Sequence, residues 1–184
     1  TQWLPSEVAL WKQADARNHW DAKDPETALK LSSQALHWDA DNPSLLTERA
    51  DWLAELERYD EAIDIYQALI ATLTTTGESA FTIQLRIQLC NHFNSRSAYT
   101  KQPSDETWQQ WEIINTWYRS GDRIKQLSLL QEANLYNNQA YQLAVSNSHL
   151  EEALGSASKC LELLGGEIYC LYSDPMYYLS LIHI

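Results

Sequence analysis

The chain has 184 residues, which is enough for one domain with a sizeable core or for two small ones. It carries 25 acidic against 13 basic residues, a net charge of −12, and so acidic a surface repels phosphate, which argues against nucleic acid and anionic lipid as partners. Its three cysteines are not spaced as a disulfide framework or a zinc site, and no apolar run approaches the roughly 20 residues of a membrane-spanning helix.

We therefore expect no membrane insertion. The chain begins at Thr1 without an apolar signal core, so a cytoplasmic location is favoured while export stays open.

Signals for helix starts recur along the chain, each with a proline in the first turn or a polar cap. They occur at Pro5, Asp24-Pro25, Asn42-Pro43 and Pro103-Ser104. Turns are expected at Thr76-Gly77 and Ser120-Gly121, and no segment shows sustained two-residue alternation. The sequence predicts an all-α chain with about eight or nine helices.

Small residues recur with a fixed period. Ala16 and Ala50 are 34 residues apart, and so are Ala28 and Ala62. This period is typical of a two-helix repeat, in which small side chains let the paired helices approach closely.

The segment 43–73 shows the pattern most clearly. Leu46, Ala50 and Leu53 form a large, small, large series, and "YDEAIDIYQALI" follows at 59–70. In these residues the sequence resembles the tetratricopeptide repeat family, most strongly over residues 24–73. The resemblance implies an antiparallel helix-hairpin solenoid, a superhelix of the tetratricopeptide type.

We expect one helical repeat domain over residues 1–178. Its units are 6–42, 43–76, a degenerate unit 77–133 and a last unit 134–165, followed by an irregular tail at 166–178. Pro103 opposes helix in the middle of the chain, so "NSRSAYTKQPS" (94–104) is interpreted as a loop. Trp108, Trp111, Ile114, Trp117 and Tyr118 cover more than half of the next helix, which predicts packing on two sides.

Motifs for catalysis are missing from the sequence: it has no Gly-rich phosphate loop, GxSxG or HExxH. Cys90 and His92 point to different faces of a helix, so Cys90 is interpreted as a core residue. Glu48, Asp51 and Glu55 belong to an acidic run that we interpret as a solvated face rather than an acid–base pair. We expect no enzyme, no metal site and no cofactor.

The resemblance also implies where a partner would bind, because the first helix of each repeat lines the inner face of the solenoid. The groove residues expected on this basis are Leu10, Gln13, Arg17, Trp20, Asp21, Thr47, Asp51, Glu55, Asn138 and Gln142. Chaperone-binding members of the family clamp a C-terminal carboxylate with Lys, Asn and Arg. Here only Arg17 is suited to that task and Asp51 would repel a carboxylate, so we expect a neutral or basic peptide instead.

The sequence leaves three functions open. The favoured one is a protein–protein interaction scaffold that binds a peptide or partner segment. The alternative is a peptide-sensing regulatory module of a multidomain signalling or transcription regulator. A weaker alternative is an all-helical carbohydrate-active enzyme, which would require Trp108, Trp111 or Trp117 to line a cavity together with paired carboxylates.

The last six residues, "LSLIHI" (179–184), are what CTG TCT CTT ATA CAC ATC encodes. This string resembles a sequencing-library adapter. We therefore expect residues 179–184 to be non-native and the chain to be a fragment of a larger protein.

Overall fold

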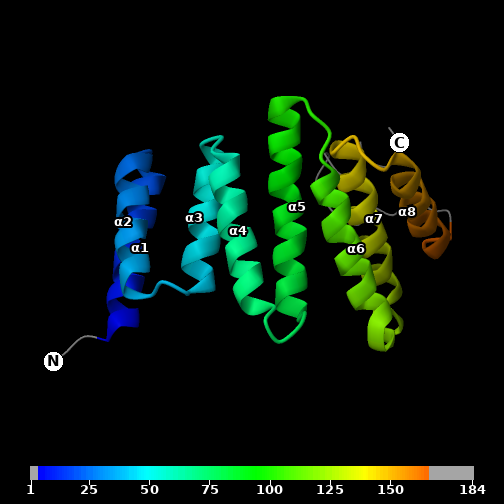
Figure 1. Ribbon diagram of the computed structural model, residues 1–184, viewed down its shortest axis with the longest axis horizontal. Coiled ribbons are helices and arrows are strands. Elements are labelled where there is room, and N and C mark those ends of the chain that lie inside the picture. The colour runs from blue at the N-terminus through cyan, green and yellow to red at the C-terminus, as the bar shows by residue number, and fades with distance from the viewer. Residues whose placement is uncertain (1–3, 166–184) are drawn as a thin grey trace. The chain divides into compact units, whose positions relative to one another are not determined.

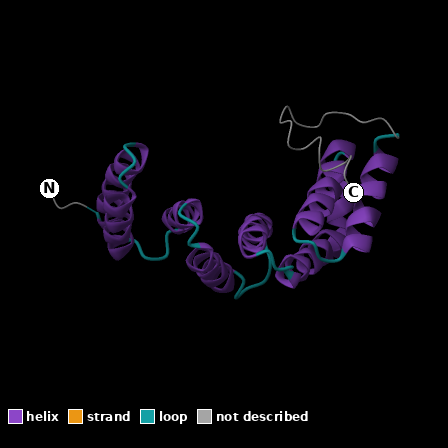
Figure 2. Cartoon of the chain, turned by 90° about the horizontal axis from the view of Figure 1, so that it is seen from above, coloured by secondary structure: helices purple, strands orange, loops and turns teal. Residues whose placement is uncertain are grey.

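A computed structural model describes residues 4–165, and all regular structure in that range is helical (Figures 1 and 2). The α-helices are α1 (Pro5–Asp21), α2 (Pro25–Trp38), α3 (Pro43–Glu55), α4 (Tyr59–Leu73), α5 (Ala80–Thr100), α6 (Asp105–Arg119), α7 (Leu129–Val145) and α8 (Leu150–Leu163). A 3-10 helix, η1 (Ser120–Gln126), follows α6. The predicted all-α class is confirmed for this range. The expected tail at 166–178 and the adapter-like residues 179–184 lie outside it.

Polar caps set the helix starts in the first half of the chain. The Asp24 carboxylate accepts from the Thr27 amide at 3.3 Å, and the Asn42 side chain accepts from the Ser44 amide at 3.0 Å. Prolines occupy the first turns of α1, α2 and α3, where the missing amide costs nothing.

The chain divides into two compact units, Thr1–Gly77 and Glu78–Ile184, which we describe separately. In the first unit, α1 packs against α2 and α3 against α4. The four alanines of the 34-residue pattern have no exposed surface: Ala16, Ala28, Ala50 and Ala62. Their small side chains are what permits the close helix pairs, so the 34-residue spacing reflects hairpin packing.

In the second unit, α5 packs against α6 and α7 against α8. The core cluster is formed by Ile83, Cys90, Trp111, Ile114, Leu135, Leu143 and Ala153. Helix α6 also contacts α7, as its wide apolar arc predicts. Since α7 starts at Leu129, the expected boundary between 133 and 134 falls inside a helix.

The interpretation of 94–104 as a loop is wrong for its first seven residues, because α5 continues to Thr100. Contacts with α6 hold this polar stretch in the helix. The Thr107 hydroxyl donates to Asn94 Oδ1 at 2.9 Å, and Arg96 pairs with Glu106 at 2.6 Å. The C-cap residue of α5 is Lys101, which has a left-handed backbone (φ 57°) and lies two residues before Pro103.

Candidate functional site

Glu48 on α3 holds two side chains of α1. Gln13 Nε2 donates to Glu48 Oε2 and Arg17 Nε donates to Glu48 Oε1, both at 2.5 Å. The bond to Glu48 raises the pKa of Arg17. Gln13 is buried, so its side chain is not accessible to a partner, and the charge of Arg17 is balanced by Glu48.

Trp20 at the end of α1 packs on α3. Its ring stacks on Trp52 with centroids 5.0 Å apart and planes within 10°. Trp52 is buried, whereas Trp20 is half-buried and borders a pocket of about 250 Å³. The other residues of that pocket are Lys23, Pro25, Glu55 and Leu56. An indole beside a carboxylate suits a cationic side chain.

The remaining predicted residues of the first unit lie at the surface. Four of them are exposed: Leu10, Asp21, Asp51 and Glu55. Asp51 accepts from the Tyr66 hydroxyl at 3.1 Å, and burial together with the nearby Asp51 charge raises the pKa of Tyr66, which therefore stays protonated. Thr47 is half-buried and donates to a backbone carbonyl of its own helix. We call Arg17, Trp20, Asp21, Thr47, Asp51 and Glu55 the α1–α3 face.

The two predicted residues of the second unit both lie on α7. Asn138 is half-buried. Gln142 is buried and accepts from Trp111 Nε1 at 2.9 Å while donating to Asn91 Oδ1 at 2.8 Å. Gln142 therefore presents no free amide group to a partner, and we leave it out of the proposed surface.

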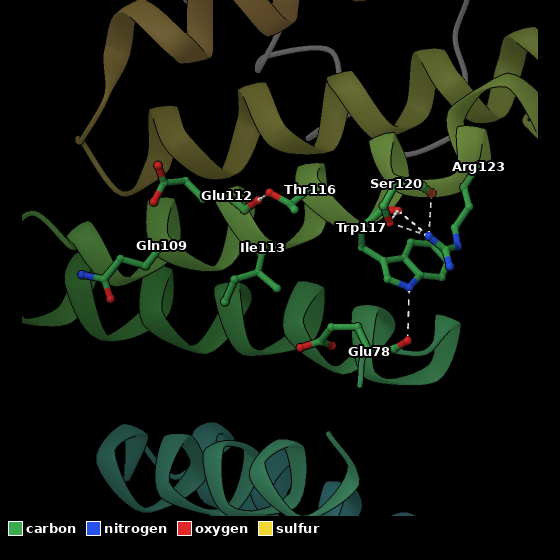
Figure 3. A pocket seen from close by; sticks show the side chains of 8 residues that line it. All are labelled: Glu78, Gln109, Glu112, Ile113, Thr116, Trp117, Ser120 and Arg123. Atoms are coloured by element: carbon green, nitrogen blue, oxygen red, sulfur yellow. Dashed lines mark hydrogen bonds between the residues drawn. The ribbon is translucent and has the colours of Figure 1, made fainter. Parts of the chain in front are cut away.

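A larger pocket of about 810 Å³ lies in the second unit (Figure 3). It is bordered by Glu78, Gln109, Glu112, Ile113, Thr116, Trp117, Ser120 and Arg123. Trp117 Nε1 donates to the Glu78 carbonyl at 3.3 Å, and the Arg123 guanidinium lies 4.6 Å from the Trp117 ring centre. The Glu78 and Glu112 carboxylates do not point toward one another in Figure 3.

A carbohydrate-active site would need a tryptophan and paired carboxylates in one cavity, and this pocket contains Trp117, Glu78 and Glu112. The properties of Glu78 do not suit the role of a glycosidase acid. Burial alone would raise the pKa of Glu78, but hydrogen bonds from Arg86 at 2.6 Å and Thr82 at 2.8 Å outweigh it and leave the pKa below its usual value. A glycosidase acid needs the opposite shift. Of the other two tryptophans, Trp111 is fully buried and Trp108 stacks on His149 at 4.7 Å.

The Cys90 thiol is buried in the core of the second unit. Burial raises the pKa of the Cys90 thiol, which keeps it protonated, and its Sγ donates to the Thr107 carbonyl at 3.8 Å. Within residues 4–165 no group of His, Cys, Asp and Glu side chains is placed to hold a metal ion. In the same range no helix is both long and apolar enough to cross a membrane.

Sequence reasoning missed three contributors to the α1–α3 region: Glu48, Trp52 and Lys23. The interpretation of Glu48 as part of a solvated acidic run is wrong, because its carboxylate accepts hydrogen bonds from two side chains of α1. Its spacing from Trp52 and Glu55, four and then three residues, is the signal of one helix face turned toward a neighbour.

Helix hairpins joined through buried alanines define a helical-repeat protein, the class of fold seen here. Residues 19–78 match the family model for the tetratricopeptide repeat, the family that the sequence resembles most strongly over residues 24–73. A similar solved structure is the N-terminal domain of stress-induced protein-1 from C. elegans. It is 12% identical, with 99% of this chain and 98% of that chain covered and a TM-score of 0.34. The comparison with curated proteins gave no match. Tetratricopeptide repeats are a protein-interaction fold.

Proposed function

We propose that the chain is an interaction scaffold whose α1–α3 face binds a neutral or basic segment of a partner protein. The observation that carries the proposal is the pocket of about 250 Å³ that the Trp20 indole, stacked on Trp52, lines together with Glu55. A rigid aromatic anchor next to a charged group is typical of binding hot spots.

The charge of the face supports a basic rather than an acidic partner. Asp21, Asp51 and Glu55 are exposed, while the charge of Arg17 is balanced by Glu48. A C-terminal carboxylate would meet three negative groups, one cation balanced by Glu48 and one exposed cation, Lys23, so the net charge of the region still favours a lysine or arginine side chain.

The test is selection of displayed 12-residue peptides on the whole chain, followed by affinity measurements on variants. We expect enrichment of lysine and arginine beside an apolar residue. Trp20→Ala should weaken the selected peptides at least tenfold, because it removes the anchor, and Glu55→Gln should weaken them about fivefold.

The matched control is Trp38→Ala on α2, an exposed tryptophan that lies outside the α1–α3 face. It should change affinity less than about twofold. Circular dichroism melting of each variant separates lost binding from lost folding. Selection without basic enrichment, or equal losses for Trp20→Ala and Trp38→Ala, would refute the proposal.

A further inference from the structure

A separate groove of about 470 Å³ runs along α4 in the first unit. Its apolar lining comes from Leu46 on α3 and from Ile65, Ala68, Leu69 and Leu73 on α4. Leu69 is buried, Ala68 is exposed and the other three are half-buried. None of these residues belongs to the α1–α3 face. We call this surface the α4 groove.

The spacing of the α4 residues suits another helix. Ile65, Leu69 and Leu73 follow one another at four-residue intervals, and Asp64, Ala68 and Thr72 form a parallel row beside them. Rows with this spacing form the ridges between which the side chains of a second helix pack. The small Ala68 leaves room for a larger side chain from outside.

Two carboxylates border the α4 groove. Asp41, in the connection between α2 and α3, and Asp64 on α4 are both exposed and line it. Within the described part of the chain, neither takes part in an ion pair or a side-chain hydrogen bond. Both are therefore available to a cation brought by a partner.

We propose that the α4 groove docks a short amphipathic helix of a partner protein that carries lysine or arginine beside a stripe of leucine-like side chains. The volume lies in the range of ligand pockets, roughly 300–1,000 Å³. Apolar anchors at helical spacing would enter the groove, and the basic side chains would meet Asp41 and Asp64. This site is additional to the α1–α3 face and would let the scaffold hold two segments at once.

The test follows amide chemical shifts of the whole 184-residue chain during titration with a helical peptide of leucine and lysine. Its leucines stand at positions i, i+3, i+4 and i+7. We expect shift changes at Leu46, Ile65 and Ala68. Ala68→Arg, which fills and charges the groove, should weaken binding at least tenfold. The control Gln67→Arg adds the same charge at the neighbouring exposed position and should change affinity less than about twofold.

The same peptide with glutamate in place of lysine should bind at least tenfold more weakly. Shift changes confined to other residues, equal effects of Ala68→Arg and Gln67→Arg, or no saturation below about 1 mM would overturn the proposal. Glu55→Gln should leave this titration unchanged. A negative result in this titration therefore does not refute binding at the α1–α3 face. A negative result in the peptide selection does not refute docking in the α4 groove.

Discussion

At the residue scale, the hydrogen bond between Trp111 and Gln142 joins α6 to α7 where neither side chain reaches solvent. The same amide group donates to Asn91 Oδ1 on α5 at 2.8 Å. One glutamine thus ties three helices together. Because it is buried, removal of either partner leaves a polar atom without a hydrogen bond.

We predict that Gln142→Leu destabilises the second unit by about 1–3 kcal/mol, since the buried Trp111 Nε1 loses its acceptor. Urea and thermal unfolding monitored by circular dichroism measure the change. Gln84→Leu on α5 is the control, because Gln84 is exposed. Equal midpoints for the two variants would show that the network contributes nothing.

These residues also show how far sequence reasoning reaches in the candidate site. The family's repeat positions put both Trp20 and Glu55 among the expected groove residues, and in the structure both line one pocket. The burial of Gln13 and Gln142 could not, since it depends on Glu48 and Trp111, which are 35 and 31 residues away in the sequence. A solvated amide and a buried, hydrogen-bonded one are identical in sequence.

At the element scale, α5 depends on its neighbours for its last two turns. Its residues 94–100 are polar and are held by side-chain bonds to α6, including the Arg96–Glu106 pair. A second pair, Arg86–Glu78, joins α5 to the segment that precedes it. Both pairs involve a carboxylate whose charge state matters for folding.

These pairs predict acid sensitivity of the second unit. Burial would raise the pKa of Glu78 and Glu106, but hydrogen bonds from Arg86 and Thr82, and from Arg96 and Ser104, leave both below the unfolded value of about 4.3. Their stabilisation is present above that pH and is lost as pH falls through the folded values.

Glu78→Gln combined with Glu106→Gln should therefore cost stability at pH 7 and almost none at pH 3. After allowance for screening we expect a difference on the order of 1 kcal/mol, measured by urea unfolding at both pH values. Glu112→Gln, an exposed carboxylate on α6, is the control. An equal cost of the double variant at both pH values would contradict this account.

At the scale of the whole molecule, the two units differ in how readily sequence predicts them. In the first, α3 and α4 have 13 and 15 residues and the period of 34 is regular. In the second, α5 has 21 residues, and η1 inserts left-handed Gly121 and Asp122 before α7. Helix lengthening set by tertiary contacts has no fixed spacing, so the repeat period does not predict that α7 spans residues 133 and 134.

The net charge of −12 also acts at this scale. It attracts basic segments over distances up to about 10 Å at moderate ionic strength, while local groups such as Glu55 determine where they settle. If binding depends only on the net charge, reversing one charge on the chain and one on the peptide should have additive effects on affinity. If a specific ion pair forms with Glu55, exchanging the two charges should restore affinity.

The most direct measurement is a charge-exchange cycle by isothermal titration, with a selected peptide and Glu55→Lys. We predict that Glu55→Lys weakens binding of the lysine-containing peptide at least tenfold. The peptide with glutamate in place of that lysine should bind the Glu55→Lys variant with most of the lost affinity restored, and should show no such gain on the unaltered chain. Additive effects without recovery would contradict a specific basic contact at Glu55 and leave only general attraction to an acidic chain.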